Sequence, residues 1–168
     1  MIDDTLSALQ NSAFSTWIQE TAYPIVITAH SIGLALLVGL LVVIDLRVLG
    51  FAKGAAMPGL RKLMTVVWIG FSCNAISGVM LFAIDAKKDY YSWLFRSKLL
   101  LIALGLIMGA RITSTVLNKT DEYASGDADA PRQAKVLAVV SLLAWVSAIF
   151  VGRWLAYNTF GDIGVDDG

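Results

Sequence analysis

The chain has 168 residues, of which 57% are hydrophobic and only 15% are charged, and its formal net charge at pH 7 is zero. Soluble domains contain about a quarter charged residues, so this composition excludes an ordinary soluble protein. A chain without excess positive charge also gives no reason to expect nucleic acid as a partner. A single cysteine, Cys73, excludes a disulfide within the chain and a cysteine-ligated iron–sulfur cluster.

The first twenty residues are typical of a short amphipathic helix that lies at a membrane interface. In residues 3–20 the acidic and amide side chains can stay in water while the apolar ones share the opposite side. The apolar set is Leu6, Leu9, Phe14, Trp17 and Ile18.

Four long apolar segments follow, and together they use nearly the whole chain. A bilayer core about 30 Å thick is crossed by roughly 20 apolar residues in a helix. The segments cover residues 22–49, 63–84, 99–117 and 136–157. We therefore predict an all-α fold: an integral membrane four-helix transmembrane bundle, surrounded by the lipid bilayer, with residues 1–168 forming a single transmembrane domain.

The distribution of lysine and arginine predicts an orientation in a bacterial inner (cytoplasmic) membrane, because positive residues concentrate on the cytoplasmic side. The links after the first and third segments hold seven, and the opposite side holds four. This bias favours both termini in the periplasm. The seven are Arg47, Lys53, Arg61, Lys62, Lys119, Arg132 and Lys135, and the four are Lys87, Lys88, Arg96 and Lys98.

The most informative residue is the only histidine, His30, which lies about 12 Å inside the first segment at 1.5 Å per residue. An ionisable side chain within a membrane helix is a functional-site hypothesis by default. Imidazole is also the commonest protein ligand for metals and binds haem iron. His30 is therefore the predicted metal or haem ligand, and the alternative is a structural histidine held by hydrogen bonds.

Other candidate site residues lie at a similar depth on the remaining segments. Small residues on the first two segments, Gly33, Ser77 and Gly78, either allow close helix packing or leave room for a flat cofactor. Met80 is a candidate second axial ligand or a packing residue. Arg153 either binds the propionates of a haem or extends to the lipid headgroups.

A second polar group is predicted at the opposite end of the bundle. Asp45 and Arg47 are too close in sequence to face one another on a helix. Arg111 on the third segment lies at a comparable depth, so we predict that an Asp45–Arg111 ion pair holds the first and third helices together.

Several motifs together resemble a family of small bacterial four-helix membrane proteins of unassigned function. They are ITAHSIGLALLVG with DLRVLG, W-x5-N-x3-G-x2-LF, FRSKLLLIALG and GRWLAY. This family is distantly similar to copper-resistance D-type proteins and to b-type membrane cytochromes. The resemblance implies that His30 is the helix-one histidine and Arg153 the helix-four arginine. It also implies a second histidine near the end of the third helix, where this chain reads LIMGARITS and has none.

The leading interpretation is a homo-oligomeric haem b protein, with His30 as axial ligand and a role in electron transfer or redox sensing near the periplasmic face, exchanging electrons with a redox partner. The iron would then be five-coordinate, or would take its second ligand from Met80 or from a neighbouring protomer. One alternative is a transport protein in which His30 binds copper or relays protons. Another is a non-catalytic structural or assembly subunit of a membrane complex. No hydrolase or transferase motif is present.

Overall fold

A computed structural model describes residues 1–51, 57–117 and 129–161, and within these ranges the regular structure is entirely helical. Four helices are long and apolar enough to cross a membrane, as predicted. They are α3 (Tyr23–Leu49), α4 (Met57–Ile84), α6 (Trp93–Ile112) and α7 (Arg132–Gly161). A π-helical turn, η2 (Thr113–Leu117), continues α6.

The helix ends follow from local chemistry. The α3 helix stops at Gly50, whose positive φ of 97° is a left-handed conformation that glycine adopts without steric cost. The α6 helix begins six residues before the predicted apolar segment because the Ser92 hydroxyl accepts a hydrogen bond from Phe95 N at 3.3 Å and caps it. Lys98, predicted to lie in a link, is therefore inside a spanning helix.

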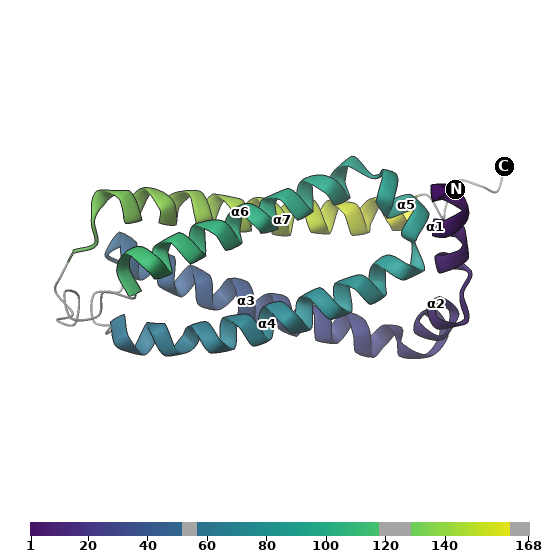
Figure 1. Cartoon of the computed structure of the whole chain (residues 1–168), viewed down its shortest axis with the longest axis horizontal. Coiled ribbons are helices and arrows are strands. Elements are labelled where there is room, and N and C mark those ends of the chain that lie inside the picture. The colour runs from purple at the N-terminus through teal and green to yellow at the C-terminus, as the bar shows by residue number, and fades with distance from the viewer. Residues whose placement is uncertain (52–56, 118–128, 162–168) are drawn as a thin grey trace.

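The bundle consists of two helix pairs (Figure 1). The α3 helix packs along α4, and α6 packs along α7. The two pairs meet mainly where α3 lies against α7. The main apolar core fills the half of the bundle near the end of α3, with Leu37, Leu41, Ile44, Ile112 and Trp145 among its buried side chains.

Glycines allow close contact within each pair. A Cβ on Gly33 would lie 2.7 Å from Asn74 N, and one on Gly70 would lie 2.9 Å from Leu37 N, so α3 and α4 touch backbone to backbone. A Cβ on Gly105 of α6 would lie 2.6 Å from the Trp145 ring of α7. At these three positions the small residue serves helix packing.

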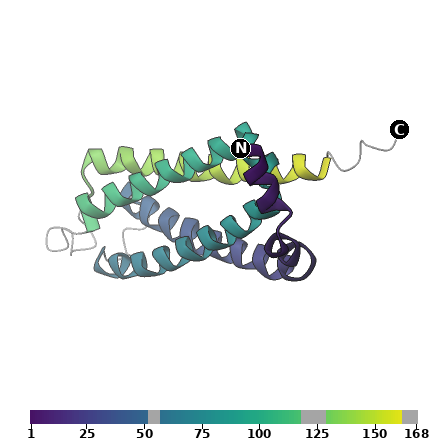
Figure 2. The same cartoon turned by 45° about the vertical axis from the view of Figure 1, so that its right-hand side comes forward.

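The predicted N-terminal helix over residues 3–20 is present but divided. It consists of α1 (Ile2–Gln10), α2 (Ala13–Trp17) and a π-helical turn, η1 (Ile18–Ala22), that leads into α3. The break falls at Ser12, whose hydroxyl caps α2 by accepting from Ser15 N at 3.2 Å. This region covers the end of the bundle beside the short helix α5 (Ala86–Tyr91), as Figures 1 and 2 show.

The predicted Asp45–Arg111 ion pair is wrong. Asp45 is 1% exposed, its Oδ2 atom has no hydrogen-bond partner, and Arg111 is exposed. The physical reason is the helix arrangement: α3 packs against α4 and α7, whereas α6 packs against α7, so α3 and α6 lie diagonally across the bundle. Equal depth on two helices does not bring their side chains together when the helices are not neighbours.

Candidate functional site

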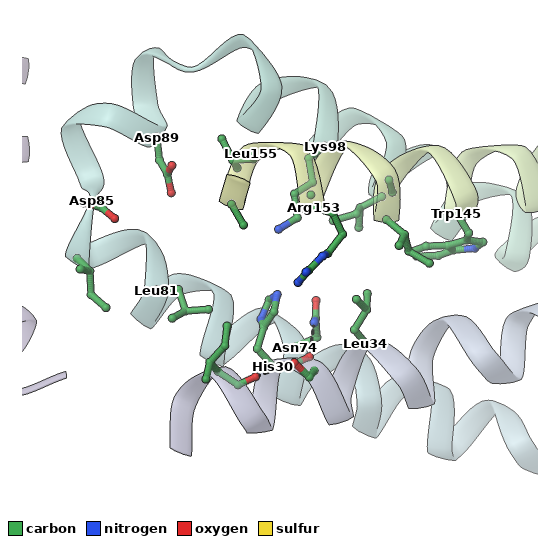
Figure 3. A pocket seen from close by; sticks show the side chains of 18 of the residues that line it. His30, Leu34, Asn74, Leu81, Asp85, Asp89, Lys98, Trp145, Arg153 and Leu155 are labelled. Atoms are coloured by element: carbon green, nitrogen blue, oxygen red, sulfur yellow. Dashed lines mark hydrogen bonds between the residues drawn. The ribbon is translucent and has the colours of Figure 1, made fainter. Parts of the chain in front are cut away.

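A cavity of about 280 Å³ lies between the two helix pairs, in the half of the bundle where α3 begins. All four spanning helices contribute to it. Its polar lining includes His30, Asn74, Lys98 and Arg153, and Figure 3 shows that these side chains come from opposite walls. The apolar lining includes Leu34, Leu81, Ile102, Trp145 and Ile149.

The His30 ring is held by Ser77 on α4. The distance from His30 Nδ1 to Ser77 Oγ is 3.1 Å. The Ser77 hydroxyl donates its only proton to the backbone, with Cys73 O at 2.6 Å and Asn74 O at 3.1 Å. Ser77 must therefore accept from Nδ1–H, so in the neutral imidazole Nε2 is the unprotonated nitrogen. A neutral imidazole with a free Nε2 is the form that binds a metal.

Two further contacts fix the position of the ring. Asn74 Nδ2 donates to His30 O at 2.9 Å, which ties the two helices together at this level. Gly78 makes space for the ring, since a Cβ there would lie 3.3 Å from His30 Cε1. Ser77, Asn74 and Gly78 thus form one α4 surface against which the imidazole is positioned.

Two cationic side chains line the same cavity from the other helix pair. Arg153 points into it from α7 and forms no hydrogen bond or ion pair with any residue in the three described ranges (Figure 3). Lys98 reaches it from α6 and is half-buried, and its Cε would lie 3.5 Å from a Cβ on Gly152. The cavity therefore presents two positive charges without paired carboxylates.

Two carboxyl groups lie beyond these cations, toward α5. Asp85 and Asp89 both line the cavity. Partial burial, and after it the nearby Asp85 carboxylate, raise the pKa of Asp89 to about 6 against the opposing effect of Lys98 and Lys88. The Asp89 carboxyl is therefore a titratable group at the edge of a cationic site.

The structure brings together four of the six predicted site residues. His30 and Arg153 line the cavity, and Ser77 and Gly78 support the imidazole. Gly33 instead lies in the α3–α4 contact. Met80 packs against the cluster of Ile18, Ala22 and Val26 and does not line the cavity.

Sequence reasoning missed several cavity residues, among them Lys98, Asn74 and Trp145. Lys98 lies directly before the apolar run LLLIALG. The signal that would have placed it inside a spanning helix was Ser92, a good N-cap residue six positions earlier. Asn74 was recognised as a polar residue within a span, but its partner on α3 could not be named. Within the described ranges no group of three or more histidine, cysteine, aspartate or glutamate side chains is placed to hold a metal ion.

These features define a four-helix membrane protein with a polar cavity built around a single histidine. The chain belongs to a family of unknown function, DUF6644, whose model matches residues 11–158. The matched range includes the whole of α3, α4 and α6, the part of α7 up to residue 158, and every residue that lines the cavity. No curated protein and no solved structure matches the chain.

Proposed function

We propose that this protein binds haem b with His30 Nε2 as an axial ligand and serves in electron transfer or redox sensing. The observation that carries the proposal is the hydrogen bond from His30 Nδ1 to Ser77, which leaves Nε2 free at a cavity wall. Haem-ligating and metal-ligating histidines characteristically donate their other ring N–H to a neighbouring acceptor, which fixes the tautomer and raises ligand basicity.

The donor set of the cavity fits a haem. Imidazole would bind the iron, and Arg153 and Lys98 would bind the two propionates, since guanidinium and ammonium groups pair with carboxylates. The apolar lining, including Leu34 and Trp145, suits a macrocycle. The cavity volume of about 280 Å³ lies just below the usual range of ligand pockets, roughly 300–1,000 Å³. A tetrapyrrole would therefore extend through the mouth, toward the two cations.

Each of these residues has a role that can be stated without the cofactor. Ser77 orients the imidazole, Asn74 fixes the backbone of His30, and Trp145 closes the inner wall of the cavity. Bound haem would supply one-electron chemistry. Met80 packs against Ile18 and Val26 and is not placed to act as a second axial ligand. The proposal therefore takes a five-coordinate iron or a ligand from another protomer.

The cellular setting is part of the same proposal. The lysine and arginine distribution supports a bacterial inner membrane with both termini in the periplasm. In that orientation the end of the bundle where α3 begins, and with it the cavity, faces the periplasm, where a redox partner would exchange electrons with the cofactor.

The test is an absorption spectrum of the detergent-purified protein, oxidised and reduced, with a pyridine haemochrome assay. We expect a b-type spectrum near one haem per chain, lost in His30→Ala and retained in the control Met80→Ala. Circular dichroism verifies that both variants remain helical. A colourless wild-type protein, or full haem content in His30→Ala, would overturn the proposal. Bound copper without haem absorption would instead favour the metal-handling alternative.

A further inference from the structure

A second polar site lies in the opposite half of the bundle. Among buried side chains of the described residues, only three polar atoms lack a hydrogen-bond partner: Asp45 Oδ2, Ser141 Oγ and Trp145 Nε1. Asp45 is 1% exposed and Ser141 is fully buried. They belong to α3 and α7, which pack against each other.

The Ser141 hydroxyl is unusual for a serine in a membrane helix. Such hydroxyls commonly bond to the carbonyl four residues earlier. Thr28, Ser31 and Ser97 do so here, at 2.7 to 3.0 Å. Ser141 forms no such bond and remains available to a partner on α3.

Asp45 also lacks an ion pair with any described cation. On α4, Arg61 and Lys62 are exposed, as are Arg111 on α6 and Arg132 on α7. Lys135 on α7 lies 3.9 Å from Asp129. Arg47 is buried but stands two residues from Asp45 on the same helix, and residues at that spacing do not face each other. An isolated carboxylate at such a place is strongly disfavoured, and a buried acid in this position takes up a proton instead.

We propose that Asp45 is a proton-binding site of the bundle and that its protonated carboxyl forms a hydrogen bond with the Ser141 hydroxyl. The proton comes from water at the end of α3, binds a carboxyl oxygen and returns to the same side. The distance supports this exchange, because Asp45 is four residues from the last residue of α3, Leu49, or about 6 Å along the helix. A metal cation is disfavoured, since no group of three ligating side chains surrounds any point in the described ranges.

The site is separate from the cavity around His30. Fifteen residues, or about 22 Å of helix, separate His30 from Asp45 along α3. The core side chains Leu37, Leu41 and Trp145 lie between them. Proton binding at Asp45 therefore does not depend on the proposed haem, and it should persist unchanged in His30→Ala.

Infrared spectroscopy of the detergent-purified protein at pH 7 tests the proposal. We expect a carbonyl stretching band of a protonated carboxylic acid that shifts in D₂O. The band should be lost in Asp45→Asn and retained in Asp89→Asn, a control that removes a half-buried acid at the other end of the bundle. Asp45→Asn should keep the wild-type unfolding temperature, because an amide has the shape and charge of a neutral carboxyl.

A second variant keeps the test decisive if Asp45→Asn does not fold. Ser141→Ala should retain the band but move its frequency, because the carboxyl loses a hydrogen-bonding neighbour. Absence of the band in wild-type protein, or a band unaffected by both Asp45→Asn and Ser141→Ala, would overturn the proposal. Haem content and this band are read independently, so a colourless protein would leave the result for Asp45 intact.

Discussion

The substitution Gly33→Ala should damage the His30 site without touching it. A Cβ at residue 33 would lie 2.7 Å from Asn74 N and 2.9 Å from Gly70 O. Both are backbone atoms, so neither can move alone. To restore an ordinary contact of 3.4 Å, α3 and α4 must separate by about 0.7 Å.

That displacement is large enough to break the bonds that position the histidine. His30 is three residues before Gly33 and so lies on the same side of α3. Its Nδ1 is 3.1 Å from Ser77 Oγ, and its carbonyl oxygen is 2.9 Å from Asn74 Nδ2. Adding about 0.7 Å takes both distances beyond about 3.5 Å, where a hydrogen bond is no longer effective.

The expected cost follows from these terms. Overpacking costs about 1–3 kcal/mol, loss of the two hydrogen bonds at about 0.5 kcal/mol each adds about 1 kcal/mol, and replacing glycine by alanine within a helix returns about 1 kcal/mol. We expect a net destabilisation of about 1–3 kcal/mol. The control is Gly39→Ala, on the same helix, where nothing lies within 4 Å of the new Cβ and only the propensity gain remains.

Thermal unfolding of both variants in detergent measures the difference. A gap of about 2–4 kcal/mol between them corresponds to roughly 5–15 °C for a protein of this size. Gly33→Ala should also bind less haem than Gly39→Ala. Equal unfolding temperatures for the two variants would refute the backbone contact between α3 and α4 on which the site geometry rests.

Two further predictions concern the charged residues of the cavity. Because the Asp89 pKa is about 6 in the folded protein and about 3.9 in an unfolded chain, the folded state binds more protons between these values and stability falls as pH rises through that window. Asp89→Asn should flatten this part of the curve of unfolding temperature against pH, and an unchanged slope would contradict the assignment. Arg153→Ala should lower haem occupancy several-fold in a haem titration, whereas Arg111→Ala, an exposed arginine at the other end, should not. Equal effects of the two would show that Arg153 has no specific role.

The spanning helices were predictable because membrane insertion depends on a local property. About 20 consecutive apolar residues form a span whatever their neighbours are, so the predicted segments agree with α3, α4, α6 and α7 apart from their ends. The end of α3 was also encoded locally, in Gly50. His30 was identifiable for a similar reason, since a lone ionisable residue in an apolar segment needs a special explanation.

The partners of these residues could not be predicted, because partners depend on which helices are neighbours. The sequence placed Asp45 and Arg111 at one depth, yet α3 and α6 are diagonal: Asp45 is buried where α3 packs against α7, and Arg111 is exposed. The same limit applies to Met80, which faces the N-terminal cluster. A pattern within one helix gives the depth of a side chain, but it does not give the neighbour toward which the side chain points.

The distribution of packing explains why a cavity exists at His30 and not at Asp45. Near Asp45 the two helix pairs are joined by a continuous apolar core. Near His30 the hydrogen bonds of Asn74 and Ser77 join α4 to α3 only. The cavity occupies the space between this helix pair and the α6–α7 pair. A ligand there would contact all four helices and complete the missing half of the core. Its binding should therefore stabilise the assembled bundle as a whole, in proportion to its occupancy.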